Sequence, residues 1–290
     1  MIRRPAVAGM FYDGTEPALR QSITDCFLSP LGPRSLPHSV GRGERRVVGL
    51  VCPHAGYVYS GPAAAHSYSV LAEDGIPEVA VILGPNHHGL GEIVAVSVAD
   101  KWETPLGLVE VDVPTARAII EYSAYAREDE LAHLREHSIE VQIPFLQYIA
   151  AVAQSSIRIV PIAIGHMSYP SSRMLVADLG PAIAEALVDR DAVIIASTDL
   201  THYESKARAQ FKDNLAIEQI LNLDADGLLR VVEENSISMC GATGTAVMLA
   251  ACKTLGATSA RRLAYYTSGD VTGDTRQVVG YAAVAIFTSS

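Results

Sequence analysis

Short runs of apolar, often β-branched residues alternate along the chain with stretches in which apolar residues recur every three or four positions. Runs of the first kind predict strands, and they fall at 46–52, 79–83, 93–98, 157–164, 192–197, 263–267 and 278–287. The second pattern predicts helices, at 15–28, 62–71, 114–122, 138–151, 172–187, 205–221, 225–235 and 244–255. This alternation predicts an α/β fold with a central mixed, mostly parallel sheet flanked by helices.

One segment, 29–45, is rich in Pro, Gly, Ser and Arg and has the composition of a linker. It lies too close to the amino terminus to separate two ordinary domains. No repeat of fixed period is present in the sequence. We therefore expect residues 1–290 to form a single domain, because a chain of this length can bury one full core.

The composition, 49% hydrophobic and 19% charged, is typical of a globular protein and excludes disordered and fibrous classes. The longest apolar runs, such as 79–83 and 192–196, are far shorter than the roughly 20 residues that span a bilayer. The first residues do not form an apolar signal segment. We therefore expect a cytoplasmic protein that does not insert into a membrane.

The charge balance is acidic, with 22 Lys and Arg against 32 Asp and Glu, a formal net charge of −10. Nucleic acid is not an expected partner, because phosphate binding needs a positive surface. The 4 cysteines are too few and too scattered for a disulfide framework. We expect them to be reduced thiols.

Several histidines directly follow predicted strands. His54 lies in PHAGY, His87 and His88 lie in GPNHHG, and His202 lies with Asp199 in STDLTH. In an open α/β sheet, ligands bind outside the carboxyl ends of the strands. Adjacent residues of an extended chain face opposite ways, so we expect only one of His87 and His88 to reach a shared centre.

Two further motifs carry reactive side chains. In EHSIE, His137 and Glu140 share a helix face if a helix begins near Ser138. In MCGATG, Cys240 precedes a turn that opens a helix, where amide dipoles favour a thiolate. A single histidine at a strand end is more often structural, but imidazole, carboxylate and thiolate groups together predict a metal or acid–base site. The spacing does not select a metal, because HExxH, CxxC and HxH signatures are absent.

Six motifs in this order resemble the Memo-like family: RPAVAGMFY at 4–12, PHAGY at 53–57, GPNHHG at 84–89, EHSIEVQIPF at 136–145, STDLTH at 197–202 and MCG at 239–241. The resemblance extends over nearly the whole chain. This family is also known as component B of the AMMECR, Memo and radical-SAM gene set, which implies a functional link to AMMECR and radical-SAM proteins. Its fold is similar to that of the LigB-type class III extradiol dioxygenases.

The resemblance implies a metal held by two histidines and one cysteine, which match His54, His87 and Cys240. The ring-cleaving dioxygenases hold Fe(II) with two histidines and a glutamate, so Cys240 stands in place of their carboxylate. A thiolate is softer than a carboxylate, and the set then suits Zn(II) or Cu as well as Fe(II). We expect Fe(II) first, with Cu or Zn as alternatives.

The resemblance also implies that Asp199 and His202 are an acidic and basic pair near the metal. His202 is the candidate general base, because an imidazole titrates near neutrality. His137 is a third candidate catalytic residue, as a group that orients ligands or faces the substrate. The predicted substrate-binding residues are Tyr12, Tyr57, His88 and Glu140.

Three functions stay open at this level. The first is a non-heme Fe(II), dioxygenase-like enzyme that acts on an aromatic or related small molecule. The second is a non-catalytic protein that binds a metal or a peptide. The third is a zinc-dependent hydrolase with His202 as base. If the chain associates, we expect a symmetric homodimer, the commonest oligomer.

Overall fold

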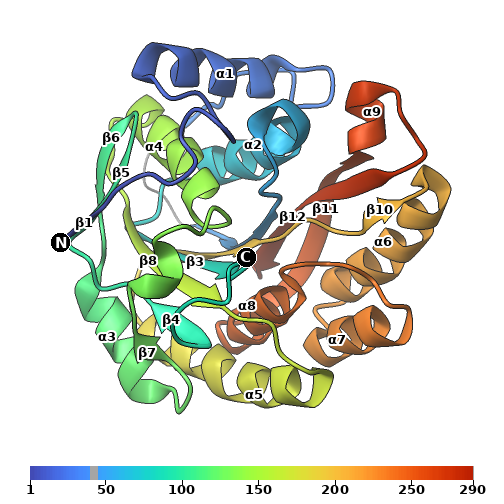
Figure 1. The fold of residues 1–290 in the computed structure, drawn as a ribbon. Helices are drawn as coiled ribbons and strands as arrows, with labels where there is room; N and C mark the ends of the chain where they lie inside the picture. The colour runs from blue at the N-terminus through green and yellow to red at the C-terminus, as the bar shows by residue number, and fades with distance from the viewer. Residues whose placement is uncertain (40–44, 290) are drawn as a thin grey trace.

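The computed structural model describes residues 1–39 and 45–289. Within them, nine strands form one sheet in the order β10-β12-β2-β9-β3-β8-β4-β7, with β11 paired to β12 (Figure 1). Its parallel centre consists of β2 (Val47–Cys52), β9 (Ala192–Ser197), β3 (Val79–Pro85) and β8 (Arg158–Ile164). The outer strands are β4 (Val94–Val96), β7 (Arg127–Glu128), β10 (His202–Glu204), β11 (Ala257–Thr267) and β12 (Val278–Thr288).

Each face of the sheet is buried, because successive side chains of a strand point to opposite faces. In β3, Val79, Val81 and Leu83 belong to one core cluster, whereas Ala80 and Ile82 belong to the other. The first cluster lies under α3 (Val113–Tyr122), α5 (Tyr169–Ala186), α6 (Lys206–Leu221), α7 (Ala225–Glu234) and α8 (Ala242–Thr254). The second lies under α1 (Glu16–Leu28), α2 (Tyr57–Asp74) and α4 (Ile143–Val152), on the opposite side of the sheet (Figure 1). This confirms the predicted α/β fold with a mixed, centrally parallel sheet.

Smaller elements complete the fold. A three-stranded sheet holds β1 (Ile2–Arg3), β5 (Lys101–Thr104) and β6 (Gly107–Glu110). The short helices are η1 (Leu131–His133), η2 (Glu140–Gln142) and α9 (Ser268–Thr272). The sequence pattern did not predict the β5–β6 hairpin or the strands β1, β7 and β10, because each of these strands spans only 2 to 4 residues.

The two largest differences between predicted and observed helix boundaries have local reasons. The helix predicted at 62–71 begins at Tyr57, because the Tyr57 ring packs into the core at 4.9 Å from the ring of Phe145 and Pro62 is accommodated inside the helix. The helix predicted at 138–151 begins only at 143, after the η2 turn. Residues 40–44 of the predicted linker lie outside the described residues.

None of the helices formed by residues 1–39 and 45–289 combines the length and the hydrophobicity that a bilayer-spanning segment needs.

Candidate metal centre

The predicted strand-end residues meet at one edge of the sheet. His54 follows β2 by two residues, His87 follows β3 by two, and Asp199 follows β9 by two. These three strands are parallel neighbours in the order β2-β9-β3. Their carboxyl ends therefore bring the three side chains together, as the sequence predicted.

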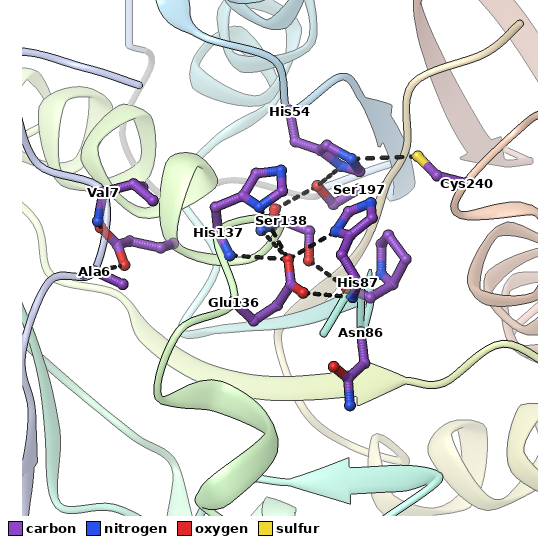
Figure 2. A network of polar contacts seen from close by, with 12 residues as sticks. Ala6, Val7, His54, Asn86, His87, Glu136, His137, Ser138, Ser197 and Cys240 are labelled. Atoms are coloured by element: carbon purple, nitrogen blue, oxygen red, sulfur yellow. Dashed lines mark hydrogen bonds and ion pairs between the residues drawn. The ribbon is translucent and has the colours of Figure 1, made fainter. Parts of the chain in front are cut away.

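Three imidazoles form a cluster at this edge. One nitrogen from each of His54, His87 and His137 lies within 4.8 Å of the other two. Figure 2 shows the rings pointing toward one another, and the ring centroids are 4.7 Å apart for His87 and His137 and 5.4 Å apart for the other two pairs. Nitrogen ligands of one metal ion lie about 3–4 Å apart, so a small closure of this cluster suits an ion. His88 lies beside His87 at the exposed turn and does not join the cluster.

Cys240 lies beside His54, just before α8 (Figure 2). Its Sγ is 3.3 Å from His54 Nε2 and accepts a hydrogen bond from the Asp199 amide at 3.3 Å. Burial, with the nearby Asp199 carboxyl, raises the pKa of the Cys240 thiol to about 12. The metal-free site therefore holds a thiol, and coordination by sulfur would release its proton.

A glycine allows this close approach of Cys240 to the end of β9. A Cβ atom on Gly241 would lie 2.6 Å from the Ser197 carbonyl oxygen and 2.6 Å from Thr198 Cβ. Any larger residue would push the two segments apart.

The hydrogen bonds around Ser197 determine which nitrogen of His54 carries the proton. The Ser197 hydroxyl donates to the Ser138 carbonyl at 2.6 Å and accepts from Gln142 Nε2 at 2.8 Å. Its remaining lone pair faces His54 Nδ1 at 3.0 Å. Because the only hydroxyl proton is already used, His54 Nδ1 must be the donor. His54 Nε2 is therefore left with a lone pair, and Nε2 is the atom beside Cys240.

The orientation of Gln142 in this network follows from its other contacts. Its Nε2 also donates to the Pro53 carbonyl at 2.9 Å, and its Oε1 accepts from the Tyr68 hydroxyl at 2.8 Å. A carbonyl oxygen can only accept, so the amide cannot be reversed. The network is buried, with Ser197 only 1% exposed and Gln142 0% exposed.

A carboxylate orients His87 in the same way. Glu136 accepts from His87 Nδ1 at 2.9 Å and from the His87 amide at 2.6 Å, and from the amides of His137 at 2.8 Å and Ser138 at 2.9 Å. Burial alone would raise the pKa of Glu136, but the His87 and Ser138 hydrogen bonds outweigh it and hold the pKa well below its ordinary range. The ionised carboxylate keeps the proton on Nδ1, so His87 Nε2 is free to bind a metal.

His54 and His137 are neutral at neutral pH. Burial lowers the pKa of His137 to about 4, against the opposing effect of Glu136, and burial also holds the pKa of His54 well below its ordinary value. Neutral imidazole is the form that binds metals. The Phe11 ring, with its centroid 4.4 Å from that of His137, covers the cluster on one side.

Asp199 lies beside His54, and His202 follows Asp199 by three residues at the start of β10. Asp199 Oδ1 accepts from the His54 amide at 2.8 Å, and burial raises the pKa of this carboxyl to about 6. His202 Nδ1 lies 2.9 Å from the Ser238 carbonyl oxygen. That oxygen only accepts, so Nδ1 carries the proton and His202 Nε2 keeps a lone pair that can take one.

Glu140 occupies a different environment from the one predicted. Its side chain is 0% exposed and pairs with Arg3. Its oxygens also accept from the Tyr12 hydroxyl at 2.6 Å and from the amides of Ala6 at 2.8 Å and Val7 at 3.0 Å. In this structure Glu140 therefore anchors the amino-terminal segment, and a fully buried carboxylate with these partners is not available to a substrate.

Two cavities lie near this region. Tyr12 and Tyr57 line one of about 500 Å³, although the Tyr57 hydroxyl is used by the Val141 carbonyl at 2.7 Å. His87 and Cys240 line another of about 620 Å³. Only the second includes residues of the predicted metal site, so the two tyrosines and that site face different cavities.

The sequence interpretation did not assign Glu136, Ser197 and Gln142, although all three lie in the motifs. One sequence feature could have identified Glu136 as a residue of the site, because it directly precedes His137 in the chain. Ser197 and Gln142 had no such feature, since their partners come from four separate segments.

The fold and the site together define an α/β protein with a histidine-rich centre at the carboxyl ends of its parallel strands. A family model described as Memo-like protein matches residues 3–285. A MEMO1 family protein of Methanopyrus kandleri is 48% identical over 286 residues, covering 98% of each chain. MEMO1 family proteins of Methanothermobacter thermautotrophicus and Thermotoga neapolitana are 47% and 44% identical, covering 97% and 99% of this chain and 99% and 100% of theirs. This chain belongs to the Memo-like family.

Proposed function

We propose that this protein holds a metal ion with His54, His87 and Cys240 and acts as a non-heme Fe(II), dioxygenase-like enzyme on an aromatic or related small molecule. One observation supports this most strongly. His54 and His87 each have Nδ1 engaged by an acceptor, which leaves both Nε2 lone pairs for an ion.

The structure offers two candidates for the third metal ligand. Cys240 Sγ lies 3.3 Å from His54 Nε2, within reach of an ion held by that nitrogen. His137 lies in the cluster of three imidazoles. We assign the thiolate to the metal and His137 to the substrate side, because a thiolate adds the negative charge that two neutral imidazoles lack.

Side chains of this protein would accept and donate the protons of the reaction. When bound, Fe(II) would supply Lewis acidity and one-electron chemistry with O₂. His202 Nε2 has the lone pair that a general base needs, and burial raises the pKa of the Asp199 carboxyl to about 6. Phe11 limits water on the His137 side.

The thiol also favours a second candidate, non-catalytic metal capture, because sulfur binds Cu and Zn strongly. A zinc-dependent hydrolase with His202 as base uses the same residues. The partners in this proposal are a small molecule or peptide, the AMMECR and radical-SAM proteins, and a second copy of the chain in a homodimer. The proposed location is the cytoplasm.

Substitution of cobalt for the native metal tests the donor set. Protein purified without oxygen is analysed for Fe, Cu and Zn, then loaded with Co(II). We expect about one ion per chain and a thiolate-to-cobalt charge-transfer band that Cys240→Ala abolishes. Cys252→Ala, which removes another buried thiol from a helix in the core, should keep the band. Absence of this band from the native cobalt protein, together with loss of the metal in His137→Ala, would assign the third position to histidine.

Oxygen consumption tests the chemistry separately. Iron-loaded protein should consume O₂ with a catechol, aminophenol or indole, and His202→Gln should slow this while it retains the metal. Tight metal binding without oxygen consumption would favour capture. Ester or amide cleavage by zinc-loaded protein would favour the hydrolase.

A further inference from the structure

The cavity of about 620 Å³ beside the cluster lies between two parts of the chain. One wall comes from 164–172, where β8 ends and α5 begins, and the other from 229–243, where α7 ends and α8 begins. His87 and Cys240 stand at its edge. Its volume is in the range of small-molecule sites, about 300–1,000 Å³.

Apolar side chains form a large part of this cavity, beside several neutral polar ones. The larger apolar members are Ile164, Met167, Leu229, Val232, Ile237 and Met239. Among the described residues that line it, none is Lys or Arg, and Glu233 supplies a carboxylate. The Ser172 and Thr243 hydroxyls lie 2.9 Å apart on the wall. The other polar side chains away from the metal site are Asn86, His166, Ser236 and Ser238.

These walls distinguish ligands by charge. An ionised carboxylate loses its hydration on entering such a site, which costs several kcal/mol when no cation replaces the water. Glu233 would add repulsion. A neutral aromatic or aliphatic body instead gains about 25 cal/mol for each Å² of apolar surface that leaves water.

We propose that this cavity is the binding site for a small, uncharged organic molecule with a largely apolar body, one edge of which faces His87 and Cys240. This inference deepens the proposed function by naming the substrate class of the same site. It depends on that function only for the chemistry at the edge, since the apolar walls exist without a metal.

Methyl NMR of the metal-free protein tests the proposal directly. Met167 and Met239 line the cavity, Met10 lines the other cavity beside Tyr12, and Met248 is buried in the core. Protein labelled at the methionine methyl groups is titrated with 4-methylcatechol and with 3,4-dihydroxybenzoate, which share a ring and differ by methyl against carboxylate. We expect saturable shifts at the two cavity methionines, with at least about tenfold weaker binding of the carboxylated ring.

A pair of substitutions on α7 tests the charge argument. Val232 lines the cavity, whereas the adjacent Val231 does not, and both are half-buried. Val232→Lys should improve binding of 3,4-dihydroxybenzoate by about tenfold, and Val231→Lys should leave it unchanged.

Each outcome decides the proposal independently of metal binding. Unmoved Met167 and Met239 signals, shifts at Met10 alone, or equal binding of the two rings would overturn it. Saturable, charge-selective shifts in a protein that takes up no metal would retain the cavity and reject the proposed metal function. Binding of stoichiometric metal without these shifts would retain the proposed metal site and reject the cavity as a binding site.

Discussion

Replacement of the Ser197 hydroxyl tests the assignment of the His54 proton. This hydroxyl donates to the Ser138 carbonyl and accepts from Gln142 and His54, at 2.6, 2.8 and 3.0 Å. Ser197→Ala removes all three hydrogen bonds and changes no charge. The same change at Ser67, whose buried hydroxyl donates to the Val51 carbonyl at 2.9 Å, provides a matched control.

The structure sets the size of the effect. Ser197→Ala leaves a ring N–H, an amide N–H and a carbonyl buried without their partner, each at a cost of about 1–3 kcal/mol. The void left by one hydroxyl is too small for a water molecule. We therefore expect a loss of at least about 3 kcal/mol in the free energy of unfolding, against about 1 kcal/mol for Ser67→Ala.

Two measurements follow the change. Urea unfolding gives the stability of both variants. The nitrogen chemical shifts of His54 in metal-free protein report the tautomer, and we expect the proton on Nδ1 in the native protein and a mixture in Ser197→Ala. Metal affinity should fall by about 10–100-fold in Ser197→Ala and stay unchanged in Ser67→Ala.

The reasoning fails under either of two results. One is a native His54 with its proton on Nε2, since the hydroxyl would then donate to the ring. The other is a Ser197→Ala variant that is no less stable than Ser67→Ala.

Three further predictions concern the support of the site. Glu140→Gln leaves the buried Arg3 without its charge partner and should cost about 3–5 kcal/mol in urea unfolding, with faster hydrogen exchange near the amino terminus. Burial and Arg3 lower the pKa of His133 from 6.5 to about 4, so the unfolded chain binds an extra proton between these values. Native stability should fall by up to about 3 kcal/mol as the pH drops from 6.5 to 4, and His133→Gln should lose this part of the pH dependence. Gly241→Ala should displace Cys240 and weaken the cobalt–thiolate band, because its Cβ would lie 2.6 Å from a carbonyl oxygen.

Each of these predictions has a simple check. Glu103→Gln removes an exposed partner of Arg4 and should cost less than about 1 kcal/mol. An unchanged pH slope in His133→Gln would show that other groups carry the acid sensitivity. Gly244→Ala, whose Cβ would lie no closer than 3.4 Å to a neighbour, should keep the cobalt band. Equal effects of the two glycine substitutions would reject the close-approach argument.

Local patterning was sufficient to predict the central strands of the sheet and one edge of the site, whereas the short outer strands β7 and β10 were not predicted. Continuous apolar runs such as 79–83 and 192–197 identify strands buried on both faces, and the helical patterns between them imply parallel neighbours. Because parallel strands end at the same edge, the pattern alone places His54, His87 and Asp199 together.

The roles of the surrounding residues depend on contacts between distant parts of the chain. Glu140 was expected to face a substrate, yet its partner Arg3 is 137 positions away in the chain. Similarly, Ser197 contacts His54 across 143 positions. Sequence patterns record which side chains can form hydrogen bonds, but the partner depends on which loops the packed core brings together. Patterning along the chain therefore establishes the fold class and the strand-end side chains of the candidate site, whereas tertiary packing decides which of their nitrogen lone pairs stay unused by hydrogen bonds.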